Sequence, residues 1–137
     1  MEIADAQKFL AANHRGVLVA RKRDGWPQIT LVTPGIDAEG RIIVTSRGTT
    51  YKAKNIRRDP RVSMLIMGEQ FSGSKYVQLQ GTAEVIALPE AMDLLIDWHR
   101  RVRGENPNWD DYREKMKEEQ RVVIRIKIEK VGPNRRG

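Results

Sequence analysis

Residues 122–131 alternate between apolar and charged side chains, and no other feature of the sequence constrains the fold as strongly. The apolar positions are Val122, Ile124, Ile126 and Ile128, and the charged positions between them are Arg125, Lys127 and Glu129. Because successive side chains of a strand point to opposite faces, this pattern predicts a β-strand with one face in a core and the other in water.

Five further segments have the composition of strands and are separated by turn residues. They are residues 16–22, 27–34, 41–46, 61–67 and 75–86. Asp24-Gly25 is typical of a hairpin turn, and Gly81 predicts a bulge or sharp bend in the longest strand. Six strands with hairpin connections predict a mainly β, α+β fold, namely a six-stranded antiparallel barrel with flanking helices.

Helical periodicity is confined to four short segments. Residues 5–12 predict a helix capped by Asp5, residues 49–58 predict a second one, and Asp59-Pro60 ends it. Pro89 is expected in the first turn of a third helix, and a fourth begins near Asn108. The inward stripes of these last two are Ala91, Leu94, Leu95, Trp98 and Val102, then Trp109, Tyr112 and Met116. We expect one domain over residues 1–132 and a flexible C-terminal tail over 133–137.

The composition excludes several classes of function. The chain of 137 residues contains no cysteine, so disulfides, thiolate nucleophiles and cysteine zinc sites are absent. Its two histidines are far apart in sequence; we expect His14 in a turn and His99 at an exposed helix position, and we predict no metal site. No apolar run of about 20 residues and no secretory signal are present, which favours a cytoplasmic protein without a membrane partner. A net charge of +7 favours an anionic partner.

A candidate anion site lies where the third strand runs into the second helix. Hydroxyl side chains at Thr45, Ser46, Thr49 and Thr50 precede Lys52 in the first turn of that helix. The N-terminus of a helix presents free N–H groups and positive potential to an anion, and a lysine supplies a full charge. The alternative is an exposed basic helix that binds only water.

Three segments together resemble the pyridoxamine-phosphate-oxidase-like split-barrel family. They are Gly25-Trp26-Pro27-Gln28-Ile29-Thr30-Leu31-Val32, Arg41-Ile42-Ile43-Val44-Thr45-Ser46 and Lys52-Ala53-Lys54-Asn55-Ile56-Arg57-Arg58-Asp59-Pro60-Arg61-Val62-Ser63, and Gly81-Thr82-Ala83-Glu84-Val85 adds to them. The run from Lys52 to Arg61 and the segment from Glu105 to Arg113 are similar to the small branch that uses the deazaflavin coenzyme F-420. The sequence departs from that branch at Thr50, Tyr51 and Lys54, and the loop Ser72-Gly73-Ser74-Lys75 lacks an aromatic residue.

The resemblance implies a homodimer with a cofactor groove between the subunits. It implies that Lys52 meets the cofactor phosphate, that Thr45, Ser46 and Arg47 line the approach to it, and that Asn55 supports that loop. It further places Gln28, Thr30 and Val32 beside the ring, with Tyr76 and Gln78 contributed by the partner subunit.

The implied activity is hydride transfer between coenzyme F-420 and a small conjugated substrate, with no catalytic side chain assigned. One alternative keeps the fold and replaces the cofactor by FMN, and another is a flavin-binding protein without turnover. A third is a small barrel that binds nucleic acid, which the charge permits. Aromatic residues make up only 6% of the chain and are not interleaved on one sheet face, so we predict no nucleic-acid partner.

Overall fold

A computed structural model describes residues 1–70 and 75–133. The predicted loop residues Ser72, Gly73 and Ser74 and most of the predicted C-terminal tail lie outside these ranges. The elements, in chain order, are α1 (Ile3–Ala12), β1 (Arg15–Arg21), β2 (Pro27–Val32), β3 (Gly35–Ile36), β4 (Ile42–Arg47), α2 (Tyr51–Arg58), β5 (Arg61–Met67), β6 (Tyr76–Ile86), α3 (Ala91–Arg103), α4 (Trp109–Glu118) and β7 (Arg121–Gly132).

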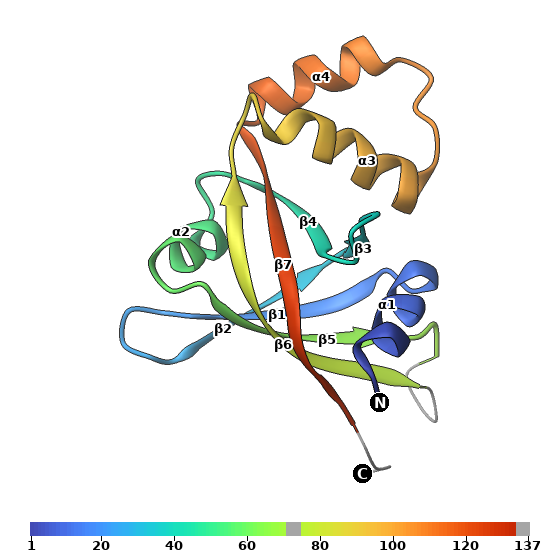
Figure 1. The fold of residues 1–137 in the computed structure, drawn as a ribbon. Helices are drawn as coiled ribbons and strands as arrows, with labels where there is room; N and C mark the ends of the chain where they lie inside the picture. The colour runs from blue at the N-terminus through green and yellow to red at the C-terminus, as the bar shows by residue number, and fades with distance from the viewer. Residues whose placement is uncertain (71–74, 134–137) are drawn as a thin grey trace.

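All strands belong to one sheet in the order β2-β1-β5-β6-β7-β4-β3, and every pairing is antiparallel. The two ends of this order, β2 and β3, are consecutive in the chain, with only Thr33 and Pro34 between them. Residues 27–36 therefore form a bent strand that pairs first with β1 and then with β4, and this switch curls the sheet into a barrel (Figure 1). Proline suits the corner because it has no N–H to donate to a ladder.

The structure confirms the predicted fold class and corrects some details. The described residues form seven strands instead of six, because the predicted strand 27–34 ends at Val32 and the chain continues as β3 after Pro34. The first helix begins at Ile3, two residues early, and Glu2 is its N-cap rather than Asp5; the Asp5 carboxylate accepts from the Glu2 backbone N–H at 2.8 Å. Pro89 lies in a turn before α3 and not in its first turn.

The bend predicted at Gly81 is present. The register between β6 and β7 shifts between Gln80 and Gly81, which is a β-bulge. A Cβ atom at Gly81 would lie 2.3 Å from the Lys127 carbonyl oxygen, so only glycine allows the two strands to approach this closely. The inward side chains of β1, β4, β5, β6 and β7 enclose the main core, with Leu18, Met64, Ile66, Ile124 and Ile126 almost fully buried.

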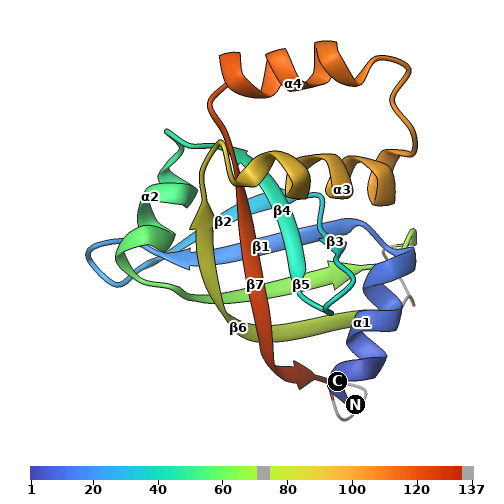
Figure 2. The same ribbon diagram turned by 45° about the horizontal axis from the view of Figure 1, so that its top comes forward.

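A second, smaller core joins the α3–α4 pair to one end of the barrel (Figure 2). Ile43 of β4 and Val123 of β7 contact Leu95 and Trp98 of α3 and Tyr112 of α4, as the predicted stripes require. Two hydrogen bonds fix these aromatic rings: the Trp98 indole donates to the Thr33 carbonyl at 2.9 Å, and the Tyr112 hydroxyl donates to the Leu95 carbonyl at 3.0 Å. The α3–α4 pair is therefore anchored to the corner of the bent strand.

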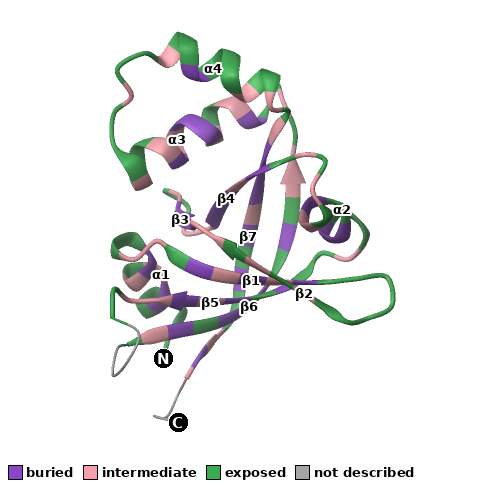
Figure 3. Ribbon diagram, turned by 180° about the vertical axis from the view of Figure 1, so that it is seen from behind, coloured by how far each residue is buried: buried purple, intermediate pink, exposed green. Residues whose placement is uncertain are grey.

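The outer face of β2, β1 and β5 carries apolar side chains that no described element covers. Ile29 is 66% exposed and Leu31 is 81% exposed. Figure 3 shows β2 in the colours of exposed and intermediate residues. Their cross-strand neighbours are Val19 and Val17, and Val17 also pairs with Leu65. Because paired residues share a face, these side chains form one apolar surface, the outer sheet face. None of the described helices is long and apolar enough to cross a membrane.

Candidate functional site

The start of α2 is built by a local hydrogen-bond network. The Thr50 hydroxyl accepts from the Ala53 N–H at 3.2 Å and caps the helix, and it also donates to the Arg47 carbonyl at 3.1 Å. The Ser46 hydroxyl donates to the same carbonyl at 3.0 Å and lies 2.9 Å from the Thr50 hydroxyl. Ser46 and Thr50 are thus engaged in holding the turn that carries Lys52.

Strand alternation separates Thr45 from Ser46. Ser46 is only 3% exposed and faces the barrel interior, whereas Thr45 lies on the opposite face of β4 with Ile43 and beneath the α3–α4 pair. The Thr45 hydroxyl makes no hydrogen bond within residues 1–70 and 75–133. Of these two predicted site residues, only Thr45 presents a free hydroxyl to a ligand.

A pocket of about 380 Å³, called here the Lys52 pocket, opens between Thr45 and the two C-terminal helices. Its lining residues are Leu31, Val32, Thr33, Thr45, Lys52, Trp98, His99, Arg103, Tyr112, Met116 and Arg121. Burial lowers the pKa of Lys52, and the nearby positive charge of Arg121 lowers it further. Since none of the described lining residues is acidic, the Lys52 ammonium group is a half-buried charge without a counter-ion.

Four lining residues with ionisable side chains were not predicted as site residues from the sequence: His99, Arg103, Tyr112 and Arg121. They come from α3, α4 and the start of β7, far from Lys52 in the chain. The stripe pattern predicted that Tyr112 is inward, and the structure confirms this burial, but nothing in the pattern placed it beside Lys52. No local sequence signal identifies such a group, because only the docking of the α3–α4 pair assembles it.

His99 is half-buried between the helices, which corrects the expectation of an exposed position. Its ring packs edge-to-face against Trp109 and Tyr112, with centroid separations of 5.4 and 5.0 Å. Its Nδ1 atom donates to the Gly104 carbonyl at 3.0 Å, since a carbonyl can only accept. His14 lies in the predicted connection after α1 and contacts the Pro34 carbonyl at 2.9 Å. In the described parts of the chain, no three metal-binding side chains gather.

A second pocket of about 630 Å³ lies on the other part of α2 and is called here the Lys54 pocket. Its lining residues are Lys22, Arg23, Gln28, Tyr51, Lys54, Asn55 and Arg58. The Asn55 amide donates to the Gln28 side-chain oxygen at 2.6 Å and accepts from Arg58 at 2.9 Å, so it ties α2 to β2. Four cations line this pocket, and no acidic residue of the described chain does.

The predicted ring-binding residues Gln28, Thr30 and Val32 occupy alternate positions of β2 and share one face. Gln28 lines the Lys54 pocket and Val32 lines the Lys52 pocket, with Thr30 between them. This face of β2 therefore connects the two pockets. The structure brings together Thr45, Lys52 and Val32 in one pocket, and Gln28 and Asn55 in the next.

The remaining three predicted residues lie elsewhere. Arg47 is exposed, and its guanidinium group forms an ion pair with Glu119 at 3.4 Å. Tyr76 and Gln78 belong to β6 and are directed to the same outer sheet face as Leu65, which pairs with Gln78. They do not line the Lys52 pocket of their own chain, which is compatible with their predicted contribution to a partner subunit.

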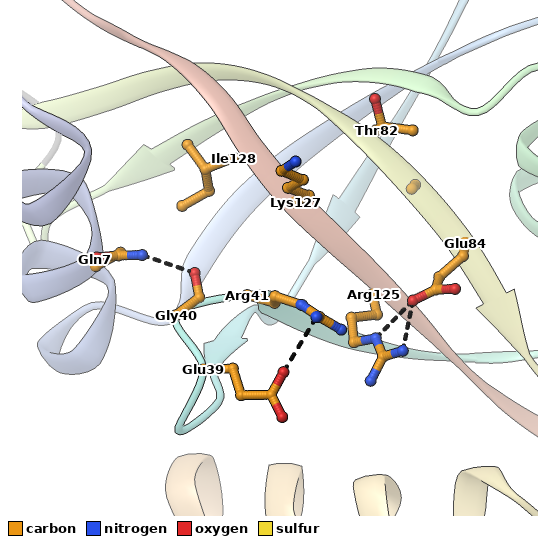
Figure 4. Close-up of a pocket in the computed structure, with 10 residues that line it drawn as sticks. Gln7, Glu39, Gly40, Arg41, Thr82, Glu84, Arg125, Lys127 and Ile128 are labelled. Carbon is orange, nitrogen blue, oxygen red and sulfur yellow. Dashed lines mark hydrogen bonds and ion pairs between the residues drawn. The ribbon is translucent and has the colours of Figure 1, made fainter.

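A third depression, of about 540 Å³, is called here the Arg125 pocket and lies between α1, the β3–β4 turn and the strands β6 and β7 (Figure 4). Its charges neutralise one another: Arg125 pairs with Glu84 at 2.6 Å, and Arg41 pairs with Glu39 at 3.2 Å. The Gln7 side chain donates to the Gly40 carbonyl at 2.9 Å. Apart from Lys127, its ionic side chains already have partners within the chain.

The family model of pyridoxamine 5'-phosphate oxidase matches residues 3–134, which is nearly the whole sequence. The chain belongs to this family. The family is one of flavin-binding oxidoreductases. This confirms the general class of the predicted function.

Solved structures agree with the family assignment. Rv2991, a conserved hypothetical protein of Mycobacterium tuberculosis, is 27% identical, with a TM-score of 0.78 and 96% of this chain and 82% of that chain covered. An F-420 reductase is 20% identical, with a TM-score of 0.69 and coverage of 92% and 94%. A FAD-binding protein of Mesorhizobium loti is 22% identical, with a TM-score of 0.65 and coverage of 96% and 90%. The latter two likenesses show the fold alone.

The residues of the Lys52 pocket fit a cofactor phosphate. The ammonium group of Lys52 lacks a counter-ion, and the Thr45 hydroxyl lacks a partner in the described chain. A phosphate oxygen would supply both, and a charge-assisted hydrogen bond in a partly desolvated site is about twice as strong as a neutral one. The network under Thr50 holds Lys52 in position before any ligand arrives.

Proposed function

We propose that this protein is an oxidoreductase that binds the deazaflavin coenzyme F-420 and transfers a hydride between it and a small conjugated substrate. The observation that carries the proposal is the half-buried, counter-ion-free Lys52 beside the free hydroxyl of Thr45. When bound, the cofactor supplies the hydride chemistry, and the protein supplies orientation and electrostatics.

The residues that line the two pockets and the β2 face have separate roles in the proposed binding mode. Lys52 and Thr45 bind the phosphate, and Arg121 adds positive potential behind them. The β2 face with Gln28, Thr30 and Val32 supports the ring, and Asn55 keeps Gln28 in place. Trp98 and Met116 form an apolar wall that excludes water from the ring's far side. A hydride entering a conjugated acceptor is completed by a proton, which solvent at the pocket mouth provides.

The Lys54 pocket supports the deazaflavin over FMN. Coenzyme F-420 carries an acidic tail beyond its phosphate, whereas FMN ends in a single phosphate. The Lys54 pocket adjoins the same β2 face and offers four cations to such a tail. FMN remains the second candidate, since the Lys52 pocket alone is sufficient to bind its single phosphate.

Absorbance titration of the purified protein with each cofactor tests the proposal. Tighter binding of coenzyme F-420 than of FMN supports it, and the reverse order favours an FMN enzyme of the same fold. If the deazaflavin binds but no conjugated acceptor is ever reduced, the protein is a flavin-binding protein without turnover. Binding of neither cofactor contradicts the proposal as a whole. A steep salt dependence of nucleic-acid retention on filters would support the nucleic-acid reading instead.

A homodimer completes the proposed site. The outer sheet face with Ile29, Leu31 and Leu65 is apolar, and a second copy of the chain, related by a two-fold axis, is its proposed partner. Because Tyr76 and Gln78 lie on this same face, a partner placed on it brings its own copies of them toward the β2 edge. We expect an interface larger than about 1,200 Å².

Light scattering at micromolar concentration tests the dimer. The expected mass is twice the 15.7 kDa of one chain. Ile29 lines none of the three pockets described above. The substitution Ile29→Glu is expected to yield monomers with weakened cofactor binding. Ile3→Glu is the matched control, because Ile3 is also an exposed apolar residue but lies on α1. A monomer that binds cofactor at full affinity contradicts both the dimer and the shared site.

A further inference from the structure

We infer that the substrate of this oxidoreductase carries an anionic group, most simply a carboxylate, which is bound by Arg103 at the wall of the Lys52 pocket. This inference rests on the proposed function and names the substrate class of the same site. It starts from the distribution of charge around the pocket and from the position of Arg103 in it.

The pocket contains more positive charge than a cofactor phosphate requires. Three basic side chains line it, namely Lys52, Arg103 and Arg121, and no acidic residue of the described chain lines it. Lys52 and Arg121 lie close enough for the charge of Arg121 to lower the pKa of Lys52, so these two form one anion-binding centre. Arg121 is also paired with Glu119 at 3.3 Å. Arg103 enters neither interaction and remains for a second anion.

Arg103 is positioned by an aromatic ring and not by a counter-ion. Its guanidinium carbon lies 5.5 Å from the centre of the Trp98 ring, and the described chain offers it no ion pair. Trp98 is itself fixed by its hydrogen bond to the Thr33 carbonyl, and it is only 7% exposed. Stacking on a fixed ring holds the planar guanidinium group while leaving its N–H donors free for a carboxylate.

Arg100 on the same helix shows the contrasting arrangement. It also stacks on an aromatic ring, with 4.8 Å to the centre of Trp109, but it forms an ion pair with Glu105 at 2.9 Å and lines no part of the Lys52 pocket. Two arginines of α3 thus both lie over tryptophan rings, and within residues 1–70 and 75–133 only the one at the pocket lacks a carboxylate partner. A carboxylate on the substrate would form an ion pair with Arg103, as Glu105 does with Arg100.

The rest of the wall fits a planar apolar body attached to that anion. Val32 supports the cofactor ring in the proposed arrangement, so Leu31, Trp98 and Met116 remain to line the space on the far side of that ring. A conjugated ring system lying against these side chains would place its carboxylate at the guanidinium group of Arg103. The substrate class is therefore a planar conjugated carboxylic acid that accepts a hydride from the reduced cofactor and a proton from solvent; in the reverse direction it gives a hydride to the oxidised cofactor and a proton to solvent.

Isothermal titration calorimetry with 2-naphthoate and its neutral isostere 2-naphthamide tests the inference. The full-length protein is titrated both free and loaded with coenzyme F-420. Wild type is expected to prefer the carboxylate by about tenfold or more, as for a charge-assisted pair. R103Q is expected to lose this preference, R103K to retain part of it, and R100Q to behave as wild type. Retention of the preference in R103Q, or equal loss in R100Q, overturns the inference, as does binding of neither probe.

The two proposals fail separately. Cofactor affinity is measured in the same variants, and R103Q is expected to bind coenzyme F-420 as wild type does. A cofactor affinity that falls with R103Q places Arg103 in the cofactor site and overturns its role toward the substrate. If wild type binds no deazaflavin but free protein still shows a carboxylate preference that depends on Arg103, the anion site stands and the proposed cofactor does not.

Discussion

The Lys52 pocket and the Arg125 pocket are both lined by charged side chains of one small barrel. The charges of the Arg125 pocket are mostly paired with opposite charges, whereas Lys52 has no such partner in the described chain. In the Arg125 pocket, Arg125 and Glu84 face each other across paired strands at 2.6 Å. In the Lys52 pocket, burial and Arg121 both act against the ammonium group of Lys52. An internally paired charge stabilises the fold a little, whereas an unpaired half-buried charge is retained at a cost to stability. The contrast indicates where an external anion belongs.

The largest effect is expected from Lys52→Met. Loss of the ammonium group should weaken cofactor binding by about 1.5–3 kcal/mol, the range for hydrogen bonds to charged groups. The melting temperature of the free protein should stay the same or rise, because the substitution removes a charge that burial disfavours. Cofactor titration and thermal unfolding measure the two effects. Unchanged affinity would remove Lys52 from the site and end the contrast between the pockets.

A smaller and more selective effect is expected from the double substitution Lys22→Gln with Lys54→Gln. Both lysines line the Lys54 pocket, and neither forms an ion pair within the described chain. Affinity for coenzyme F-420 should fall about three- to fivefold, as expected for exposed charges, while affinity for FMN should not change. Parallel absorbance titrations compare the two cofactors. An equal fall for both would show that this pocket does not discriminate between them.

The pH dependence of binding should follow the lowered pKa of Lys52. Because the pKa of Lys52 in the folded protein lies below the usual 10.5, Lys52 loses its charge before the pH reaches that value. Cofactor affinity should therefore start to fall as the pH is raised toward 10.5. The stability of the free protein should move in the opposite direction and rise as pH passes through that folded pKa, because the neutral form is the one the fold favours. Lys52→Arg is the control and should bind with little pH dependence, since arginine stays charged. Affinity that is flat to pH 10.5 in wild type would contradict the prediction.

The smallest effect is expected in the Arg125 pocket. Glu84→Gln removes one half of a partly exposed ion pair and should cost at most about 1 kcal/mol of unfolding free energy. Cofactor binding should be unaffected, because no predicted site residue lines that pocket. Urea unfolding of Glu84→Gln, Arg125→Met and the double variant yields the coupling energy directly. A loss of cofactor affinity in these variants would mean that the two pockets are not independent.

Local pattern was sufficient for most of the barrel. Alternation placed β5 and β7 on the predicted strands, and Asp24-Gly25 marked the hairpin in which Gly25 has φ 88°. Gly81 marked the bulge. The break at Pro34 was missed, since alternation continues across it and only the change of pairing partner from β1 to β4 divides the strand.

The candidate site was predictable only in its local part. Thr45, Lys52 and Val32 meet in one pocket, and Gln28 and Asn55 are hydrogen-bonded to each other. The pattern of hydroxyl residues did not show that Ser46 and Thr45 point in opposite directions. Strand alternation directs Ser46 into the barrel and Thr45 toward α3. The roles of Tyr76 and Gln78 stay predictions, because they depend on a second chain.

The sequence by itself determined the kind of elements and their order, and it singled out Lys52 at the start of α2 as a candidate anion-binding residue. These follow from periodicity and turn chemistry, which act over a few residues. Only the tertiary structure decided that Arg103 and Arg121, some 50 and 70 positions beyond Lys52 in the chain, line the same pocket without an acidic neighbour there. Which charges are neutralised depends on which side chains meet when α3 and α4 dock on the barrel. The apolar stripes predict that Leu95 and Trp98 are buried, but no local pattern encodes which barrel residues they contact.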